Sequence, residues 1–353
     1  MARPGLRAVI HIGAEKTGTT TLQEFLHLNR GLLAESGVVF PATPGLRQHG
    51  LLSLACLDPG RENQQARTYA PFVVDPEAWR AEFAQAFQGE VAARAPGMQA
   101  LLLSSELFHT QLLQPREVAR LKDLLDPFCD SYRIVFYMRR QDRLEVSRYS
   151  TNLRAGGTRA SPLPERHDRY LNYEAVLARW VPVFGAASLV PRVYERARFR
   201  GGDLVADFLD AAGLPGLADG TRPDRRNTAL SARAQMLLRA FNLRAPTLPW
   251  GRLPDRATVR KAVAGYLASR FPGPPMLPTR DEALAFYARY RESNARIARQ
   301  WFQRDALFDE DFGAYPEQAG DPAPDAGQVD AILDDAVAHA AGIAMPPASS
   351  EHG

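Results

Sequence analysis

The apolar residues of the N-terminal half follow two periodicities in turn. Short runs of consecutive apolar residues, typical of strands that are buried on both faces, are separated by stretches in which apolar residues recur every three or four positions. The expected strands are 6–12, 38–40, 100–104, 133–138 and 188–194, and the expected helices are 17–35, 76–94, 115–128, 141–154 and 203–212. Because strands and helices alternate, the pattern predicts a parallel sheet that is covered by helices on both faces.

The C-terminal part has helical spacing alone. Helices are expected over 231–242, 256–270 and 281–302, with Pro-rich turns between them. Further on, the chain becomes rich in Pro, Asp, Gly and Ala, and only 329–340 has the pattern of a weak helix. The polar segment 154–169 is too long for an ordinary connection and is interpreted as a lid or substrate loop.

These changes of pattern predict three parts of the chain. The first is an α/β core with ligand-binding loops, the second is a helical extension that packs on the core, and the third is a flexible C-terminal tail. Their expected bounds are 1–215, 216–314 and 315–353.

The composition is that of a folded protein, because 45% of the 353 residues are hydrophobic and 24% are charged. The 43 Lys and Arg against 40 Asp and Glu give a net charge of +3, which does not indicate a nucleic-acid or membrane-surface partner. Two cysteines, with no Cys/His cluster at ligand spacing, predict neither a disulfide framework nor a metal site. We expect a cytoplasmic protein without a membrane span, since the chain has no signal-like apolar segment and no window of about 18 apolar residues.

Lysine is rare among these cations. Only Lys16, Lys122 and Lys261 are present, and the other cations are arginine. A codon bias explains the general excess of arginine. A position that has kept lysine is therefore one where a compact ammonium is favoured over a planar guanidinium.

A glycine turn follows the first expected strand and contains one of these lysines. Its sequence is Gly13-Ala14-Glu15-Lys16-Thr17-Gly18-Thr19-Thr20-Thr21. A turn of this kind directs backbone N–H groups and the positive end of a helix dipole at one point, where an anion is stabilised. The Lys16 ammonium and the threonine hydroxyls add further donors, so the turn is a candidate phosphate loop.

The loop differs from that of ATP-binding proteins. The spacing of Gly13 and Gly18 matches the start of a Walker A motif, but Thr19 stands where that motif requires lysine. No expected strand ends in the Asp that supports Mg²⁺ in P-loop NTPases. The sequence therefore disfavours an ordinary ATP site.

A second cationic motif follows the strand 133–138. Arg139 ends that strand, and Ser147 lies eight positions later on the next helix. Together with the segment from Lys16 to Thr20, this pair resembles the two donor motifs of the sulfotransferase superfamily, whose donor is 3′-phosphoadenosine-5′-phosphosulfate (PAPS). Further similarity to the bacterial carbohydrate-sulfotransferase-like branch is found in Arg140-Gln141-Asp142, 226–231 and 293–294.

The resemblance implies a P-loop NTPase-like, three-layer α/β/α fold with a central parallel sheet and a mostly helical C-terminal part. It implies transfer of the sulfuryl group from PAPS to a hydroxyl, or an amine, of a carbohydrate or glycolipid-type acceptor, without a metal ion. The 5′-phosphosulfate is expected on Lys16, Thr17, Gly18, Thr19, Thr20 and Thr21, and the 3′-phosphate on Arg139 and Ser147. Arg226 is expected to bind the 3′-phosphate from the far side or an anionic acceptor. Lys16 is also expected to stabilise the leaving phosphate oxygen.

The acceptor hydroxyl requires a base. Glu106 follows the strand 100–104, whose carboxyl end should meet the phosphate loop at one edge of the sheet. Members of the family place a Glu, His or Lys at this strand end. His49, which lies in a polar break before an apolar helix, is expected to contact the acceptor, and His109 is a more peripheral alternative. His11 lies inside a strand, where a buried histidine is expected.

Two other functions fit the same loop. One is an ATP-dependent small-molecule kinase with Glu106 behind Mg²⁺, and the other is a catalytically inactive nucleotide-binding or scaffold protein. The acceptor and the oligomeric state are not predicted by the sequence.

Overall fold

The computed structural model describes residues 5–58, 61, 73, 75–165, 169–224, 229–247, 255–318, 320 and 326–344. Its contacts divide the chain into two compact units. The first unit is Met1–Arg140, Asp168–Arg225 and Tyr290–Asp309, and the second is Gln141–His167, Arg226–Arg289 and Glu310–Gly353. This division differs from the expected boundary at residue 215, because helix α8 (Gln141–Arg154) packs with the later helices.

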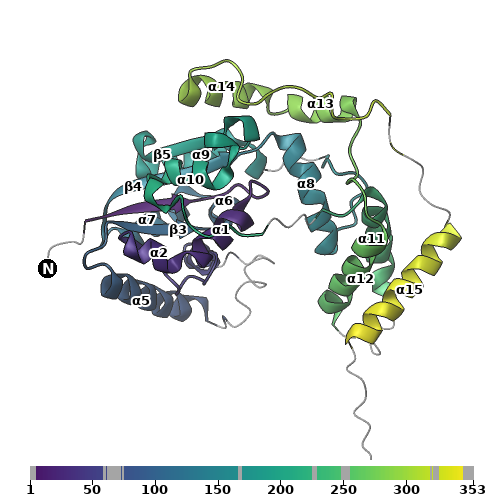
Figure 1. Cartoon of the computed structure of the whole chain (residues 1–353), viewed down its shortest axis with the longest axis horizontal. Helices are drawn as coiled ribbons and strands as arrows, with labels where there is room; N and C mark the ends of the chain where they lie inside the picture. The colour runs from purple at the N-terminus through teal and green to yellow at the C-terminus, as the bar shows by residue number, and fades with distance from the viewer. Residues whose placement is uncertain are drawn as a thin grey trace, which may run out of the picture. The chain divides into compact units, whose positions relative to one another are not determined.

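The first unit is built on a sheet of five parallel strands (Figure 1). The strands are β1 (Leu6–His11), β2 (Val38–Val39), β3 (Ala100–Ser104), β4 (Cys129–Met138) and β5 (Leu189–Val193). Their order is β2-β3-β1-β4-β5, which places β1 at the centre. The structure therefore confirms the α/β class with a central parallel sheet. Strand β4 begins earlier than expected because its polar start still pairs with Leu6 and Arg7 of β1.

Helices cover both faces of this sheet. The helices of the first unit are α1 (Thr19–Leu28), α2 (Arg30–Glu35), α3 (Gly50–Ala55), α5 (Pro76–Arg94), α6 (Leu107–Gln111), α7 (Pro115–Leu125), α9 (Tyr173–Phe184), α10 (Leu204–Ala212) and α14 (Arg291–Phe302). Short 3₁₀ turns occur at Arg169–Leu171, Ala186–Ser188, Arg196–Arg198, Arg200–Gly202, Pro215–Leu217 and, in the second unit, Ala245–Thr247.

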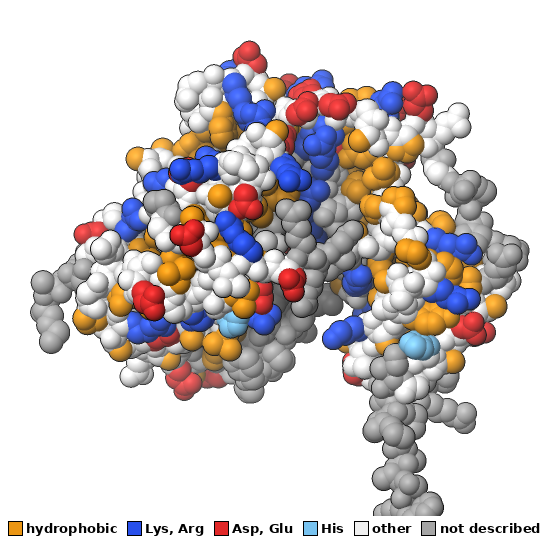
Figure 2. Space-filling model, viewed as in Figure 1, with side chains coloured by type: hydrophobic (Ala, Val, Ile, Leu, Met, Phe, Trp, Pro, Cys, Tyr) orange, Lys and Arg blue, Asp and Glu red, His pale blue; other side chains and the backbone are white. Residues whose placement is uncertain are grey.

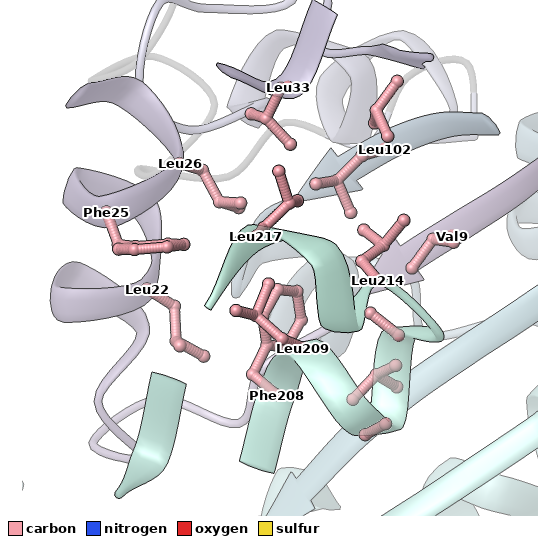
Figure 3. Close-up of a cluster of buried hydrophobic side chains, with 14 of the residues drawn as sticks. Val9, Leu22, Phe25, Leu26, Leu33, Leu102, Phe208, Leu209, Leu214 and Leu217 are labelled. Atoms are coloured by element: carbon pink, nitrogen blue, oxygen red, sulfur yellow. The ribbon is translucent and has the colours of Figure 1, made fainter. Parts of the chain in front are cut away.

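The core on one face lies between β1, β3 and β4 and helices α1, α2 and α10. Figure 3 shows Phe25 and Leu26 of α1 directed at the same space as Leu209 of α10 and Leu217, which ends the 3₁₀ turn after α10. On the opposite face, Phe136 of β4 contacts the rings of His109 in α6 and Tyr173 in α9. Successive side chains of β4 therefore pack alternately against the helices on the two faces of the sheet.

Side-chain caps explain where several helices begin, among them α9, which the sequence pattern did not predict. Asp75 accepts hydrogen bonds from the first turn of α5, next to Pro76 at the first helical position. Asn172 and Asp203 cap α9 and α10 in the same way. Each such cap contributes about 1 kcal/mol to helix stability.

The second unit is helical. It contains α8 and four further helices, α11 (Ala232–Arg244), α12 (Arg256–Arg270), α13 (Arg280–Ala288) and α15 (Ala326–Ala344). Its core joins side chains of α8, α11, α12 and α15. Leu333, Ala336 and Ala340 of α15 are buried there. A flexible tail was expected over 315–353, and 326–344 differ from that expectation because their small apolar residues pack on α11 and α12.

Part of the segment expected to form a lid is held on α8. The Arg159 guanidinium donates hydrogen bonds to the carbonyls of Ser161 and Pro162 and to the Glu145 carboxylate. The Tyr149 hydroxyl donates to the Arg159 carbonyl at 2.8 Å. Residues 155–165 therefore have fixed contacts within this unit, and the lid role stays a prediction.

Two of the predicted helices are interrupted. The segment 17–35 divides at Asn29, whose side chain bonds both the Phe25 carbonyl and the backbone of Thr221. The segment 281–302 divides at Arg289 and Tyr290, where the chain passes from the second unit to the first. Tertiary contacts therefore override a continuous helical pattern at both positions.

Charges of both signs are mixed over the surface of each unit that Figure 2 shows, in agreement with the small net charge. Within the described ranges, the helices include none with both the length and the apolar character needed to cross a bilayer.

Candidate functional site

The predicted site residues of the first unit gather at one edge of its sheet. The register aligns His11 at the end of β1 with Ser104 at the end of β3, and Met138 at the end of β4 with Val193 at the end of β5. The phosphate loop, Glu106, Arg139 and Tyr194 each follow one of these strand ends. Ligands of open α/β sheets bind at this carboxyl edge.

The phosphate loop begins by extending the sheet. The Ala14 amide donates to the Tyr137 carbonyl at 2.9 Å, and the Tyr137 amide donates to the Gly13 carbonyl at 2.8 Å. The Thr17 hydroxyl then donates to the Ala14 carbonyl at 2.6 Å. These bonds fix the start of the loop against β4.

The end of the loop leaves the N-terminus of α1 open. Lys16 and Gly18 have left-handed φ values of 60° and 77°, and Thr19 begins the helix. No side chain of the described residues caps this terminus. Because the first N–H groups of a helix need acceptors, this end can take an anion. Thr17 and Thr19 are buried in the turn, whereas Thr20 and Thr21 are exposed.

Gly18 is required by close packing as well as by its backbone conformation. A Cβ atom at this position would lie 2.2 Å from Cδ2 of Leu204, the first residue of α10, and 3.4 Å from the Tyr194 ring. The φ of 77° is also one that side chains rarely adopt. The loop is therefore held from the side of α10 and β5.

Arg139 is attached to the loop. Its Nη1 donates a hydrogen bond to the Lys16 carbonyl at 2.7 Å, and its guanidinium lies 5.5 Å from the centroid of the Tyr194 ring. Tyr194 is itself fixed to β4 by a 2.7 Å bond from its amide to the Met138 carbonyl. The sequence reasoning missed Tyr194, although its place directly after a strand at the ligand edge was a usable signal.

Glu106 lies beside the start of the loop. It precedes α6, and its Cα would be 3.2 Å from a Cβ added to Gly13. One carboxylate oxygen, Oε2, accepts a 2.8 Å hydrogen bond from Nε2 of Gln23 in α1. Gln23 was not predicted from the sequence, and its position one helical turn after Thr19 was the available signal.

His49 is enclosed rather than open to a ligand. Its Nδ1 accepts a 3.2 Å hydrogen bond from the Ser104 amide, and its ring centroid lies 4.7 Å from that of Phe40. Burial lowers the pKa of His49 to about 3, with the charge of Arg30 as a smaller cause. The ring is fully buried, and the acceptor contact expected for His49 stays a prediction.

The other two histidines considered from the sequence, His11 and His109, are buried as well. His11 shares a 2.9 Å hydrogen bond between its Nδ1 and the Ser104 hydroxyl, and burial lowers its pKa to about 3. His11 is thus a buried strand histidine, as expected. Nε2 of His109 bonds the Tyr170 carbonyl at 2.8 Å on the far face of the sheet.

Two predicted residues are not brought to this edge by the described contacts of the first unit. Ser147 lies half-buried on α8 in the second unit, and its role stays a prediction. Arg226 lies outside the described residues, which stop at 224 and resume at 229. Among the described residues, no group of three or more His, Cys, Asp and Glu side chains is arranged to hold a metal ion.

Comparisons with known proteins give distant similarities. No protein-family model matches the chain. A protein of Archaeoglobus fulgidus described as uncharacterized is 25% identical over 224 residues, which are 62% of this chain and 59% of that protein. The chain thus spans less than two thirds of the length of this relative.

Two solved structures that are similar to the chain are sulfotransferases by name. One is a sulfotransferase from Alicyclobacillus acidocaldarius, with 18% identity, 70% of this chain and 96% of that chain covered, and a TM-score of 0.38. The other is the sulfotransferase domain of the Synechococcus PCC 7002 olefin synthase, with 13% identity, 60% and 75% covered, and a TM-score of 0.30. At these identities and TM-scores, neither likeness establishes what this chain does.

Proposed function

We propose that this protein is a PAPS-dependent sulfotransferase that acts on a hydroxyl, or an amine, of a carbohydrate or glycolipid-type acceptor. The observation that carries the proposal is the 2.7 Å hydrogen bond from Arg139 to the Lys16 carbonyl. It joins the loop suited to a 5′-phosphosulfate to the strand-end arginine suited to a 3′-phosphate. Two adjoining anion-binding elements fit a nucleotide that carries phosphate groups on two positions of its ribose.

The geometry of the loop supports part of the proposed donor site, and the sequence resemblance alone supports Ser147 and Arg226. The open N-terminus of α1 and the loop from Lys16 to Thr21 would bind the 5′-phosphosulfate. Arg139 would bind the 3′-phosphate through its guanidinium, with Ser147 and Arg226 as further predicted ligands. The Lys16 ammonium would follow the bridging oxygen as negative charge develops there.

The proposed reaction is an in-line displacement at sulfur. The acceptor oxygen attacks the sulfur atom while the bond from sulfur to the 5′-phosphate oxygen breaks, and the phosphate leaves with the electron pair. The acceptor proton passes to the carboxylate of Glu106, a residue whose Cα and Cβ lie beside Gly13 at the start of the loop. Lys16 stabilises the leaving oxygen, so the proposed reaction needs no metal ion.

Nucleotide binding separates this proposal from the kinase alternative. Isothermal titration calorimetry with 3′-phosphoadenosine-5′-phosphate (PAP), without Mg²⁺, should give a dissociation constant at least about tenfold below that of ADP, because only PAP engages Arg139. Arg139→Ala should remove most of that difference. Tighter binding of Mg²⁺-ATP than of PAP would overturn the proposal.

Turnover separates the proposal from the scaffold alternative. With radiolabelled PAPS and a panel of carbohydrate and glycolipid acceptors, the protein should transfer label, and Lys16→Ala should lower kcat about 10²–10³-fold. Lys122→Ala is the matched control, because Lys122 lies on α7 and its ammonium is already paired with Asp126, directly after that helix, at 2.7 Å. An unchanged kcat in Lys16→Ala, or no transfer to any acceptor, would contradict the proposed function.

A further inference from the structure

The hydrogen bond between Gln23 and Glu106 links two elements that are far apart in the sequence. Nε2 of Gln23 in α1 donates to Oε2 of Glu106, which follows β3, at 2.8 Å. Gln23 has only 7% of its surface exposed, whereas Glu106 is half-buried. The amide therefore contacts the carboxylate from the enclosed side, where hydrogen bonds to a charged group are strong.

Helix α1 joins the phosphate loop at its first residue and contacts Glu106 through Gln23. Thr19 begins the helix at the phosphate loop, and Gln23 follows four residues later on the same face. Four residues correspond to about 6 Å along the axis, so one rigid turn joins the two positions. Gln23 is thereby held by the same turn that ends the phosphate loop.

The backbone of Glu106 is held separately. Its Cα adjoins Gly13, and the amide of the preceding Ser105 donates to the His11 carbonyl at 3.0 Å. Three rotatable bonds lie between this Cα and the carboxylate oxygens, and these contacts leave them unrestrained. Within the described part of the chain, the Gln23 amide is the one side-chain donor to this carboxylate.

We propose that Gln23 is a positioning residue, which fixes one oxygen of the Glu106 carboxylate and so directs the other at the acceptor hydroxyl. The inference rests on the proposed function, in which Glu106 accepts the proton. The neutral Gln23 amide orients the carboxylate through one directed hydrogen bond. It adds no positive charge to that of Lys16 in the proposed site. The phosphate loop ends at the first residue of α1. One helix therefore fixes the position of the proposed PAPS site relative to the Glu106 base.

The test is a double-mutant cycle on turnover. Gln23→Met keeps the length and volume of the side chain but removes the donor, and it should lower kcat about 10- to 100-fold while the KM for the acceptor and the Kd for PAP change less than about twofold. In a Glu106→Gln background the same substitution should have no further effect on kcat. Gln88→Met is the matched control, since Gln88 lies on α5 and donates to the Leu124 carbonyl.

Each outcome separates the inference from the function on which it rests. An equal loss of kcat from Gln23→Met in both backgrounds, or no loss in either, would overturn the positioning role alone. Absence of transfer by the unmodified protein would overturn the proposed function and the inference together. If Gln23→Met does not bind PAP, Gln23→Asn replaces it, because Asn keeps the amide but is one methylene too short to reach Glu106.

Discussion

Ser104 brings two neutral histidines together behind the phosphate loop. Its hydroxyl bonds Nδ1 of His11 and its amide donates to Nδ1 of His49. The strand pattern was sufficient to predict that His11 is buried. It was not sufficient for His49, because the polar residues around it resemble an open loop and the covering ring of Phe40 is not visible in a local pattern.

The two rings should make the protein sensitive to acid. Burial lowers the pKa of His49 from 6.5 to about 3, so the unfolded state binds a proton in a range where the folded state does not. The free energy of unfolding should therefore fall as the pH drops below about 6.5. His49→Asn keeps an acceptor for the Ser104 amide but cannot take up a proton.

In that variant the slope of unfolding free energy against pH, between roughly pH 4 and 6, should be lower by about 1.4 kcal/mol per pH unit. Urea unfolding at several pH values measures the slope. Equal slopes in the variant and the unmodified protein would show that His49 does not cause this acid sensitivity.

At the level of elements, the helix starts were the most predictable part of the fold. The ranges 76–94, 141–154 and 256–270 agree with α5, α8 and α12, because their apolar positions, and the Asp caps of α5 and α12, are local in sequence. The break at Asn29 was not predictable, since its partner Thr221 lies 192 residues away. The same holds for Gln23 and Glu106, which are 83 residues apart.

Gly18 tests how the loop is joined to α1. Gly18→Ala would place a Cβ 2.2 Å from Leu204 at a left-handed φ, so we expect a loss of about 1–2 kcal/mol of stability and a PAP affinity lowered more than about tenfold. Adding Leu204→Ala should restore part of the affinity, because it removes the clash but not the backbone strain. Calorimetry and thermal unfolding measure both effects.

Gly89 provides the control for that substitution. It lies inside α5, and a Cβ there would meet no atom within 4 Å. Gly89→Ala should raise stability by about 0.5–1 kcal/mol and leave PAP binding unchanged. A similar loss of PAP affinity in both variants would contradict the assigned role of the Gly18 turn.

For the molecule as a whole, the class of the fold was predictable but its division into units was not. The alternation of strands and helices predicts the sheet, since each element shows its own period. The packing of α15 was not evident, because alanines such as Ala336 and Ala340 contribute little to a hydrophobic pattern. Their small side chains nevertheless allow α15 to pack on α12.

The contribution of α15 to the second unit is measurable by a matched pair of substitutions. Leu333 is 1% exposed in the helical core, so Leu333→Ala should cost about 2–5 kcal/mol of unfolding free energy. Asp334 is next to it but exposed and paired with Arg244 at the surface, so Asp334→Ala should change stability by less than about 1 kcal/mol. Urea unfolding compares the two, and equal effects would mean that α15 does not belong to this core.

Each unit is built from several separate segments of the chain, so the first unit cannot be complete until its last segment has been synthesised. The crossings lie at residues 140, 167, 225, 289 and 309, so neither unit is a contiguous piece of the sequence. Arg140 is 1% exposed and donates to the Asp309 carbonyl at 2.7 Å, which is synthesised 169 residues later. When β5 has been synthesised, every strand of the sheet is therefore present, but Asp309, the partner of the buried Arg140 guanidinium, is not. The first unit is completed only when Tyr290–Asp309 have been synthesised, so a gene fragment that ends after β5 would encode an incomplete first unit.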